Sequence, residues 1–326
     1  MKLSKTLLGS ACLLAVGVMQ PVAAQSGGQM SIVVPYPPGG GSDFVARTIA
    51  PVMARALNRN IIVENLSGAG GAVGSARVLQ RPADGQTLLL GSPNEVILAP
   101  EVNPALDYQA EDFRLVGAAT VTSQVLVARS SFEPQDAAAV LEHARKPETE
   151  AVTYGSVGIG SLYHVTGEVL ASETNTKLLH VPYRGVAPLV QDLIGGQVDI
   201  SFLPMAGSVL GLIRDNKIKA YGVAQTERNP LSPEIPTLGE IAPELKNFHY
   251  PTWAGLLVRA ETPDDVVHAL QNALSQALAD PQVRKAIEDS GSAVAEPIDL
   301  TRAAAQYAAD IQQFRGIVND HSIAAP

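Results

Sequence analysis

The chain is poor in cysteine, in aromatic residues and in cations. Its single cysteine, Cys12, excludes an internal disulfide, and aromatic residues make up only 5% of the 326 positions. Hydrophobic residues make up 46% and charged residues 17%, and no low-complexity tract is present. This is the composition of a folded globular protein that is long enough for two domains.

The chain begins with an apolar run, residues 6–19, which is shorter than the roughly 20 residues that a bilayer-spanning helix needs. The run follows the basic start MKLSK and precedes the small residues VAA at 22–24, the pattern of a secretory signal peptide. We therefore expect residues 1–24 to be a signal peptide that is cleaved near Ala24. Cys12 lies inside it in a poor context for lipid attachment, so the mature chain would contain no cysteine and no cysteine-based metal site.

Cations are scarce relative to acidic residues. The full chain has 23 Lys and Arg against 32 Asp and Glu, and removal of Lys2 and Lys5 with the signal peptide gives 21 − 32 = −11. No basic stripe is present, so we do not expect nucleic acid as a partner. The negative field would oppose a small anion at long range, but salt screens it over about 8–10 Å. An anion site in this chain must therefore be built from local donors.

Past the first 24 residues, short apolar runs alternate with helical patterns. Strands are expected at 30–36, 60–65 and 87–92, and amphipathic helices at 43–57 and 70–80. This order is typical of a parallel, doubly wound α/β sheet.

The rest of the chain repeats the alternation. Further strands are expected within 115–129 and at 151–156, 177–183, 198–203, 218–226 and 253–259, and further helices at 136–145, 161–174, 186–196, 207–217, 264–279 and 300–320. The segment VPYPPGG at 34–40 has a counterpart in VPYRGVAP at 181–188, each between a strand and a helix. Two α/β lobes with corresponding loops are the hypothesis that this repeat suggests.

Four strand-to-helix loops are rich in small residues: PYPPGGGSD (35–43), NLSGAGGAVG (65–74), YGSVGIGS (154–161) and PYRGVAP (182–188). In a parallel α/β sheet such loops lie beyond the carboxyl ends of the strands, where ligands bind. Glycine lets backbone N–H groups approach a ligand closely, and the following helix N-terminus adds unpaired donors and partial positive charge. Such loops predict an anion site that needs neither lysine nor arginine.

The known catalytic and nucleotide-binding motifs do not fit these loops. None has the Gly-Lys-Ser/Thr of a phosphate loop, and Gly68, Gly70 and Val73 miss the third glycine of the dinucleotide fingerprint. No G-x-S-x-G nucleophile motif is present. The six histidines are spread along the chain without metal-ligand spacing, at positions 143, 164, 180, 249, 268 and 321. We therefore expect a binding protein with no catalytic residue, no metal and no cofactor, in which Asp43 offsets the dipole of its helix.

Six motifs, in this order, carry a resemblance to a known family: VPYPPGGGSDFVAR (34–47), VENLSGAGGAVGSARV (63–78), DGQTLLLGS (84–92), YGSVGIGSLYHVTGE (154–168), HVPYRGVAPLVQDLIGGQVDISF (180–202) and IPTLGE (235–240). The series resembles that of the periplasmic substrate-binding proteins of tripartite tricarboxylate transporters, the TctC or Bug type. The resemblance covers essentially all of the mature chain.

The resemblance implies a two-lobed periplasmic-binding-protein-like (type II) fold, in which each lobe is a doubly wound mixed α/β sheet. Lobe 1 would comprise residues 25–126 and 226–326, and lobe 2 residues 127–225. Two crossing strands would join them, at 124–129 and 221–226. The ligands of this family are mostly small carboxylated molecules, namely di- and tricarboxylates, acidic amino acids and aromatic acids.

Carried over by position, the resemblance implies that a ligand carboxylate is held in lobe 1 by Tyr36, Pro37, Gly39, Gly70, Gly71 and Gly74. From lobe 2 the implied contacts are Ser156, Gly158, Gly160, Ser161, Tyr183 and Gly185. Many relatives have an acidic residue at the position of Leu203, where it would suit a ligand ammonium group. Leu203 therefore favours a non-amino organic acid.

The function implied is an extracytoplasmic solute-binding protein, a periplasmic monomer that delivers its ligand to membrane permease subunits. The same site would also serve a sensor that presents the bound acid to a signalling receptor. An extracytoplasmic enzyme is the remaining alternative.

Overall fold

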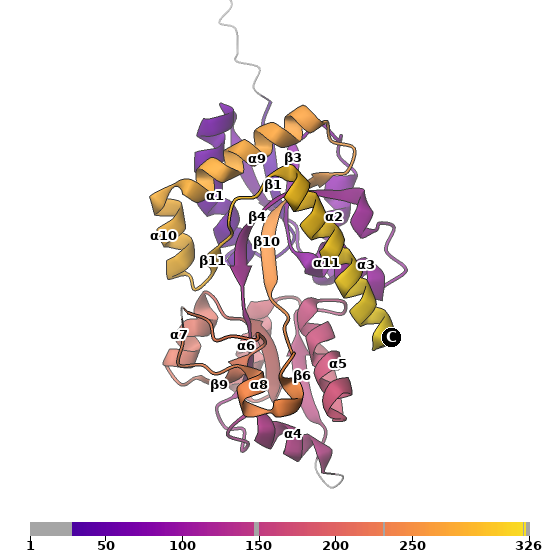
Figure 1. Cartoon of the computed structure of the whole chain (residues 1–326), viewed down its shortest axis with the longest axis vertical. Coiled ribbons are helices and arrows are strands. Elements are labelled where there is room, and N and C mark those ends of the chain that lie inside the picture. The colour runs from indigo at the N-terminus through magenta and orange to yellow at the C-terminus, as the bar shows by residue number, and fades with distance from the viewer. Residues whose placement is uncertain (1–27, 147–149, 231, 322, 324–326) are drawn as a thin grey trace, which may run out of the picture.

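The computed structural model describes residues 28–146, 150–230, 232–321 and 323, and it has two α/β lobes stacked along its long axis (Figure 1). The expected signal peptide and Cys12 lie outside the described residues. Within the described ranges, no helix has the length and apolar character needed to cross a membrane.

The first lobe is built on a six-stranded sheet with the strand order β11-β4-β10-β3-β1-β2. Its strands are β1 (Met30–Val34), β2 (Ile61–Asn65), β3 (Thr87–Gly91), β4 (Phe113–Thr122), β10 (Thr252–Arg259) and β11 (Ala293–Val294). The strands β1, β2 and β3 are parallel, whereas β10 runs antiparallel to β3 and β4. The mixed sheet that the family resemblance implies is therefore confirmed, whereas the parallel order expected from the alternation of strands and helices holds only for β1, β2 and β3.

Helices cover both faces of this sheet because side chains alternate along its strands. Ile32 and Val34 pack with α1 (Gly41–Leu57), α9 (Asp264–Ala279) and α10 (Pro281–Asp289) on one face. Val33 points to the other face, towards α2 (Ala72–Leu79) and α11 (Leu300–Asp320). Shorter helical segments complete the lobe: η1 (Ala69–Gly71), η2 (Asn94–Leu98), α3 (Ala99–Val102) and η3 (Ala110–Asp112).

The second lobe contains a five-stranded sheet with the order β7-β6-β8-β5-β9. Its strands are β5 (Gln124–Arg129), β6 (Val152–Ser156), β7 (Leu178–Pro182), β8 (Ile200–Pro204) and β9 (Ile218–Val223), and its helices are α4 (Ala137–Arg145), α5 (Leu162–Thr174), α6 (Val186–Gly195) and α7 (Ser208–Arg214). Leu203 is fully buried in β8 and pairs with Val125, so its side chain belongs to the core.

The chain passes from the first sheet to the second at Ser123, between β4 and β5. It returns between β9 and β10 through α8 (Leu238–Ile241) and η4 (Pro243–Leu245). Of the two segments expected to cross between the lobes, 124–129 is the whole of β5 and 221–226 contains the end of β9, and these strands are neighbours in the second sheet. Ser123 Oγ donates to Gln225 Oε1 at 2.7 Å, so the two crossing connections are tied together at the junction.

Candidate functional site

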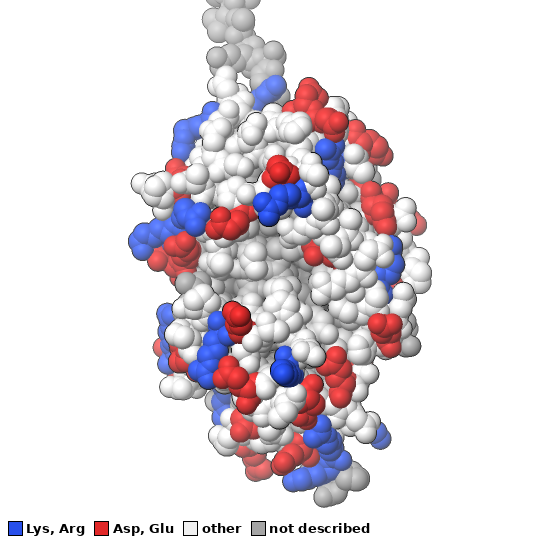
Figure 2. Space-filling model, viewed as in Figure 1, with Lys and Arg blue, Asp and Glu red and all other residues white. Residues whose placement is uncertain are grey.

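Three loops of the first lobe lie side by side at the carboxyl ends of β1, β2 and β3, which are adjacent in the sheet. The first two are the glycine-rich loops that the sequence singled out, and the third begins at Ser92. All three end in helical segments, so their backbone N–H groups gather at one edge of the sheet. In the space-filling view the band between the lobes is largely uncharged, and most Asp, Glu, Lys and Arg side chains lie over the outer surfaces (Figure 2).

The β1 loop is held in shape by Asp43, which is only 5% exposed. Its carboxylate accepts hydrogen bonds from the Gly39 N–H at 2.9 Å, from Arg47 Nε at 3.0 Å and from Asn65 Nδ2 at 3.0 Å. Burial alone would raise the pKa of Asp43, but the bonds from Arg47, Gly39 and Asn65 outweigh it and lower the pKa. Asp43 thus closes the loop, beyond the dipole role expected from its position.

The N-terminus of α1 is open. Gly40 is the N-cap, with φ −79° and ψ 172°, and no side chain caps the helix. Gly39, Gly40 and Gly41 are exposed. The Gly39 N–H is already used by Asp43, but the N–H groups of Gly40 and Gly41 have no acceptor among the described residues. Open donors next to a helix dipole are the arrangement that an anion site requires.

The β2 loop places Gly70 towards the second lobe and Gly71 against the first. Gly71 has φ +103°, and a Cβ added there would lie 2.7 Å from Cβ of Glu95. Gly74, inside α2, packs in the same way against Pro35, with an added Cβ 2.8 Å from its Cα. Both glycines are therefore required by close packing within the lobe, whereas the Gly70 N–H has no acceptor among the described residues.

The β3 loop was missed by the sequence analysis, because it contains few glycines. It brings Ser92, Asn94 and Glu95 to the same edge, and all three are buried. Tyr36 Oη lies 2.8 Å from Glu95 Oε2 and 3.3 Å from the Gly70 carbonyl oxygen, so Tyr36 and Glu95 together link all three loops. The polar run SPNE directly after the apolar strand TLLLG is the signal that would have located it.

In the second lobe the loop after β6 is satisfied internally. Ser156 is fully buried, and its Oγ accepts from the Gly158 N–H at 3.1 Å. The Gly160 N–H donates to His164 Nδ1 at 3.2 Å, and Ser161 caps α5 by accepting from the His164 N–H. The structure therefore brings these predicted residues to the boundary between the lobes, with their polar groups already paired.

Two histidines, His164 and His180, form hydrogen bonds to the loop after β6. The rings of His164 and His180 are in contact, tilted by 31° with centroids 4.2 Å apart, and His180 stacks on Tyr154 with centroids 4.9 Å apart. His180 Nε2 lies 2.7 Å from Ser156 Oγ. Burial lowers the pKa of His164 to about 4, and burial and the neighbouring His164 lower that of His180 to about 4. At neutral pH both rings are uncharged and hold the loop by hydrogen bonds.

The loop after β7 supplies a second open helix N-terminus. Gly185 is the N-cap of α6, with φ +154° and no side-chain cap. Tyr183 does not point its hydroxyl into the site, because Tyr183 Oη donates to Asp192 Oδ2 at 2.9 Å. Arg184 is the only Lys or Arg in the four glycine-rich loops, and its side chain is exposed.

The two lobes meet through glycines. A Cβ added to Gly185 would lie 3.8 Å from Pro37 Cδ, one added to Gly158 would lie 3.2 Å from Gly70 Cα, and one added to Gly160 would lie 3.0 Å from Ala99 Cα. A direct hydrogen bond also crosses the boundary, from the Leu162 N–H to Asn94 Oδ1 at 2.6 Å. Side chains at Gly158 and Gly160 would press against the backbone of the first lobe, so these two glycines allow the lobes to approach, whereas at Gly185 the contact would be an ordinary one.

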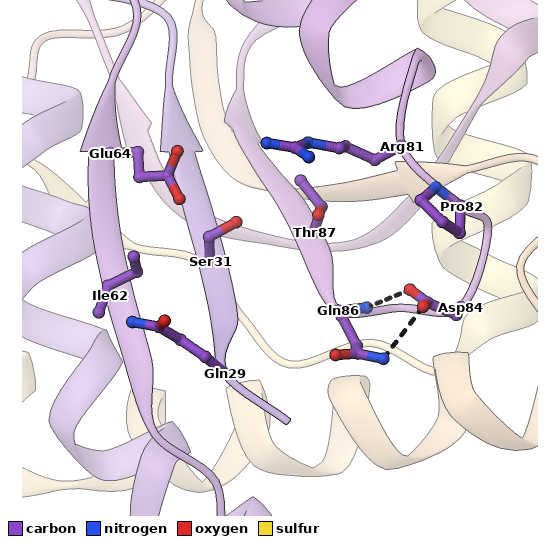
Figure 3. A pocket seen from close by; sticks show the side chains of 9 residues that line it. All are labelled: Gln29, Ser31, Ile62, Glu64, Arg81, Pro82, Asp84, Gln86 and Thr87. Atoms are coloured by element: carbon purple, nitrogen blue, oxygen red, sulfur yellow. Dashed lines mark hydrogen bonds between the residues drawn. The ribbon is translucent and has the colours of Figure 1, made fainter. Parts of the chain in front are cut away.

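A polar hollow of about 260 Å³ lies elsewhere on the first lobe. It is lined by Gln29, Ser31, Ile62, Glu64, Arg81, Pro82, Asp84, Gln86 and Thr87 (Figure 3). Most of these residues lie towards the amino ends of β1 and β3, the end opposite the glycine-rich loops, and Glu64 lies further along β2. Ligands of open α/β sheets bind outside the carboxyl ends of the strands, so we assign the candidate site to the loops between the lobes.

The sequence model of the Tripartite tricarboxylate transporter family receptor, TctC, matches residues 45–319. The chain belongs to this family. A receptor of known structure, MatC from Rhodopseudomonas palustris with bound malate, is 31% identical and superposes with a TM-score of 0.82, covering 89% of this chain and 98% of MatC. Among curated relatives, the UPF0065 protein in the tcbD-tcbE intergenic region of Pseudomonas sp. strain P51 is 34% identical over 260 residues, which are 79% of this chain and 76% of the relative. Protein BugT of Bordetella pertussis is 29% identical over 313 residues, which are 93% of each chain.

Membership of the TctC receptor family confirms the resemblance read from the six motifs. The match to MatC confirms the two-lobed fold. For this receptor, the ligand contacts and the lobe limits of 25–126 with 226–326 and 127–225 stay predictions.

Proposed function

We propose that this receptor captures a small carboxylated organic acid between its lobes in the periplasm and delivers it to a membrane permease, without catalysing a reaction. One observation carries the proposal. The uncapped N-termini of α1 and α6 come from different lobes, and the loops that lead into them approach each other so closely that a Cβ added to Gly185 would contact Pro37. Unpaired N–H donors and two helix dipoles at one boundary favour a small anion.

The similarity to MatC supports a carboxylate as the anion, because that receptor has malate bound. We therefore propose that one ligand carboxylate lies on the N–H groups of Gly40, Gly41 and Gly70. Tyr36, Pro37 and Gly39 shape this part of the site, and Gly185 faces it from the second lobe. Gly71, Gly74, Ser156, Gly158, Gly160, Ser161 and Tyr183 would act by packing and by holding the loops.

Ligand capture would be coupled to closure of the lobes. To shift an open-to-closed ratio from 99:1 to 1:99, a ligand must favour the closed state by about 5.5 kcal/mol. Charge-assisted hydrogen bonds contribute roughly 1.5–3 kcal/mol each, so two or three bonds made only in the closed state would suffice.

A thermal-shift screen followed by calorimetry tests the binding. The purified mature protein is mixed with malate, other di- and tricarboxylates, monocarboxylates, sugars and cationic amino acids. At about 100 times Kd, a ligand stabilises the folded state by roughly 2.7 kcal/mol. We expect a carboxylate to raise the melting temperature, and stabilisation by a sugar or a cation alone would refute the proposal.

Delivery to a permease is tested in cells. Deletion of the gene should abolish uptake of the radiolabelled acid identified by the screen, and a plasmid copy should restore it. Unchanged uptake would contradict a transport role. Release of a chemically altered product from the purified protein would contradict the non-enzymatic part of the proposal.

A further inference from the structure

Glu95 is a fully buried carboxyl group between the three loops of the first lobe. It lies in η2, a stretch of π-helix, an element frequent at functional sites. Its Oε1 accepts from the Ser92 N–H at 2.5 Å, and its Oε2 accepts from Ser92 Oγ and Tyr36 Oη, both at 2.8 Å. Through Ser92 it holds the β3 loop, and through Tyr36 the β1 loop.

No cation balances this carboxyl group in the described part of the chain, where Glu95 forms no ion pair. The titratable side chains that interact with it come from four elements: Tyr36 after β1, Tyr108 before η3, Tyr163 in α5 and Tyr307 in α11. Burial raises the pKa of Glu95 to about 7, although the bonds from Ser92 and Tyr36 oppose the rise.

The geometry accommodates Glu95 in both protonation states. A tyrosine hydroxyl has one hydrogen, and Tyr36 Oη lies within reach of two acceptors, Glu95 Oε2 at 2.8 Å and the Gly70 carbonyl oxygen at 3.3 Å. When Glu95 is ionised, Tyr36 donates to it. When Oε2 carries a proton, Glu95 donates to Tyr36 Oη, and the Tyr36 hydrogen turns to Gly70. Every polar group remains paired in either state.

A ligand carboxylate on the first-lobe loops would add a negative charge close to Glu95. The Gly70 carbonyl oxygen accepts a hydrogen bond from Tyr36 Oη, and Gly71 packs directly on the Glu95 side chain. Two like charges in a buried site disfavour each other, and the one that can be neutralised takes a proton. We propose that Glu95 holds the three loops of the carboxylate site in place and takes up a proton from solvent when the carboxylate ligand binds. This inference rests on the proposed function.

Calorimetry with malate tests the proton uptake directly. Malate is titrated into the whole mature protein at pH 8 in Tris and in HEPES, which differ in ionisation enthalpy. We expect the observed enthalpy to differ between the buffers by an amount corresponding to a fraction of a proton taken up per malate. Above pH 7 the affinity of the wild type should fall, by at most about tenfold per pH unit.

Glu95→Gln imitates the protonated side chain, so it should bind malate with equal enthalpies in the two buffers and an affinity independent of pH. Asp84→Asn is the control, because Asp84 lies in the same lobe but lines the hollow just before the amino end of β3, away from the loops (Figure 3). It should behave as the wild type. Malate binding without proton uptake in the wild type would overturn the inference and leave the proposed function intact, even if Glu95→Gln does not fold.

A measurement without ligand separates a failure of the proton-uptake inference from a failure of the proposed carboxylate binding. A raised carboxyl pKa favours the folded state most below the unfolded pKa of about 4.5, and this advantage is lost as the pH rises to about 7. Urea unfolding of wild type and Glu95→Gln should therefore converge or cross between pH 5 and pH 8. Parallel curves would overturn the inference even if no acid binds. Curves that converge, with no acid bound in the screen, would instead overturn the proposed function and this inference with it.

Discussion

Asn94 in the first lobe accepts a 2.6 Å hydrogen bond from the backbone N–H of Leu162 in the second lobe. Leu162 is the first residue of α5, so its N–H has no partner within the helix. Asn94 is buried at the end of the β3 loop and completes the N-terminus of α5 across the boundary. This bond exists only while the lobes are together, so it contributes to the closed state alone.

Asn94→Leu should therefore destabilise closure. The variant leaves the Leu162 N–H unpaired in the closed state, at a cost of about 1–3 kcal/mol. We expect malate to dissociate faster, and the ligand-bound protein to have a larger radius of gyration in X-ray scattering. The free energy of unfolding of the whole protein without ligand should change little. An unchanged dissociation rate would show that Asn94 does not act on closure.

Asp43→Asn should loosen the β1 loop. The amide that replaces one carboxylate oxygen would face the donors of Arg47, Asn65 or Gly39, and at least one bond is lost. We expect a loss of about 1–3 kcal/mol in the free energy of unfolding, faster hydrogen exchange at Gly39 and several-fold weaker malate binding.

Asp199→Asn is a matched control for Asp43→Asn. Asp199 accepts from Arg129 Nε at 2.9 Å and from the Thr153 N–H at 2.9 Å, in the sheet of the second lobe. It should lower stability by a similar amount but leave the affinity of the folded protein for malate unchanged. Equal effects of both variants on affinity would contradict a specific role of Asp43 in the site.

His164 predicts a loss of stability in acid. Burial holds its folded pKa at about 4, whereas an unfolded histidine titrates near 6.5. A lowered histidine pKa leaves stability complete above pH 6.5 and removes it as the pH falls to about 4, by up to about 3 kcal/mol. His164→Asn keeps an acceptor for the Gly160 N–H and cannot become charged. Its unfolding free energy should fall less steeply than that of the wild type between pH 6.5 and pH 4.5, and parallel curves would contradict the pKa.

Much of the fold could be read from periodicity. The helices expected at 264–279 and 300–320 are α9 and α11 with the same bounds, and most strands differ from their expected ranges by a few residues. The short helix α10 and the two-residue strand β11 were not expected. α10 has only nine residues and buries only Val283 and Ile287, a stripe of one i, i+4 pair, and β11 is defined only by its pairing with β4.

The site was predicted less completely than the fold. Glycines mark both backbone donors and close packing, and sequence alone does not separate Gly70 from Gly71 and Gly74. The contact between the rings of His164 in α5 and His180 in β7 joins residues that are 16 positions apart, and no local pattern encodes it. Asn94 and Glu95 act through partners in other loops, so their roles depend on tertiary structure.

Gly40→Asp tests the carboxylate site most directly. Gly40 has the backbone geometry of an N-cap, and an added Cβ would lie 3.5 Å from the Pro37 carbonyl oxygen, an ordinary contact. An aspartate there accepts from the N–H of Ser42 or Asp43 and places a negative charge beside the Gly40 and Gly41 donors that we propose for the ligand. Calorimetry should show that Gly40→Asp keeps its melting temperature but binds malate at least about tenfold more weakly, a difference of about 1.4 kcal/mol, whereas Gly40→Ala binds nearly as the wild type does. Wild-type affinity in Gly40→Asp would show that the N-terminus of α1 does not hold the carboxylate.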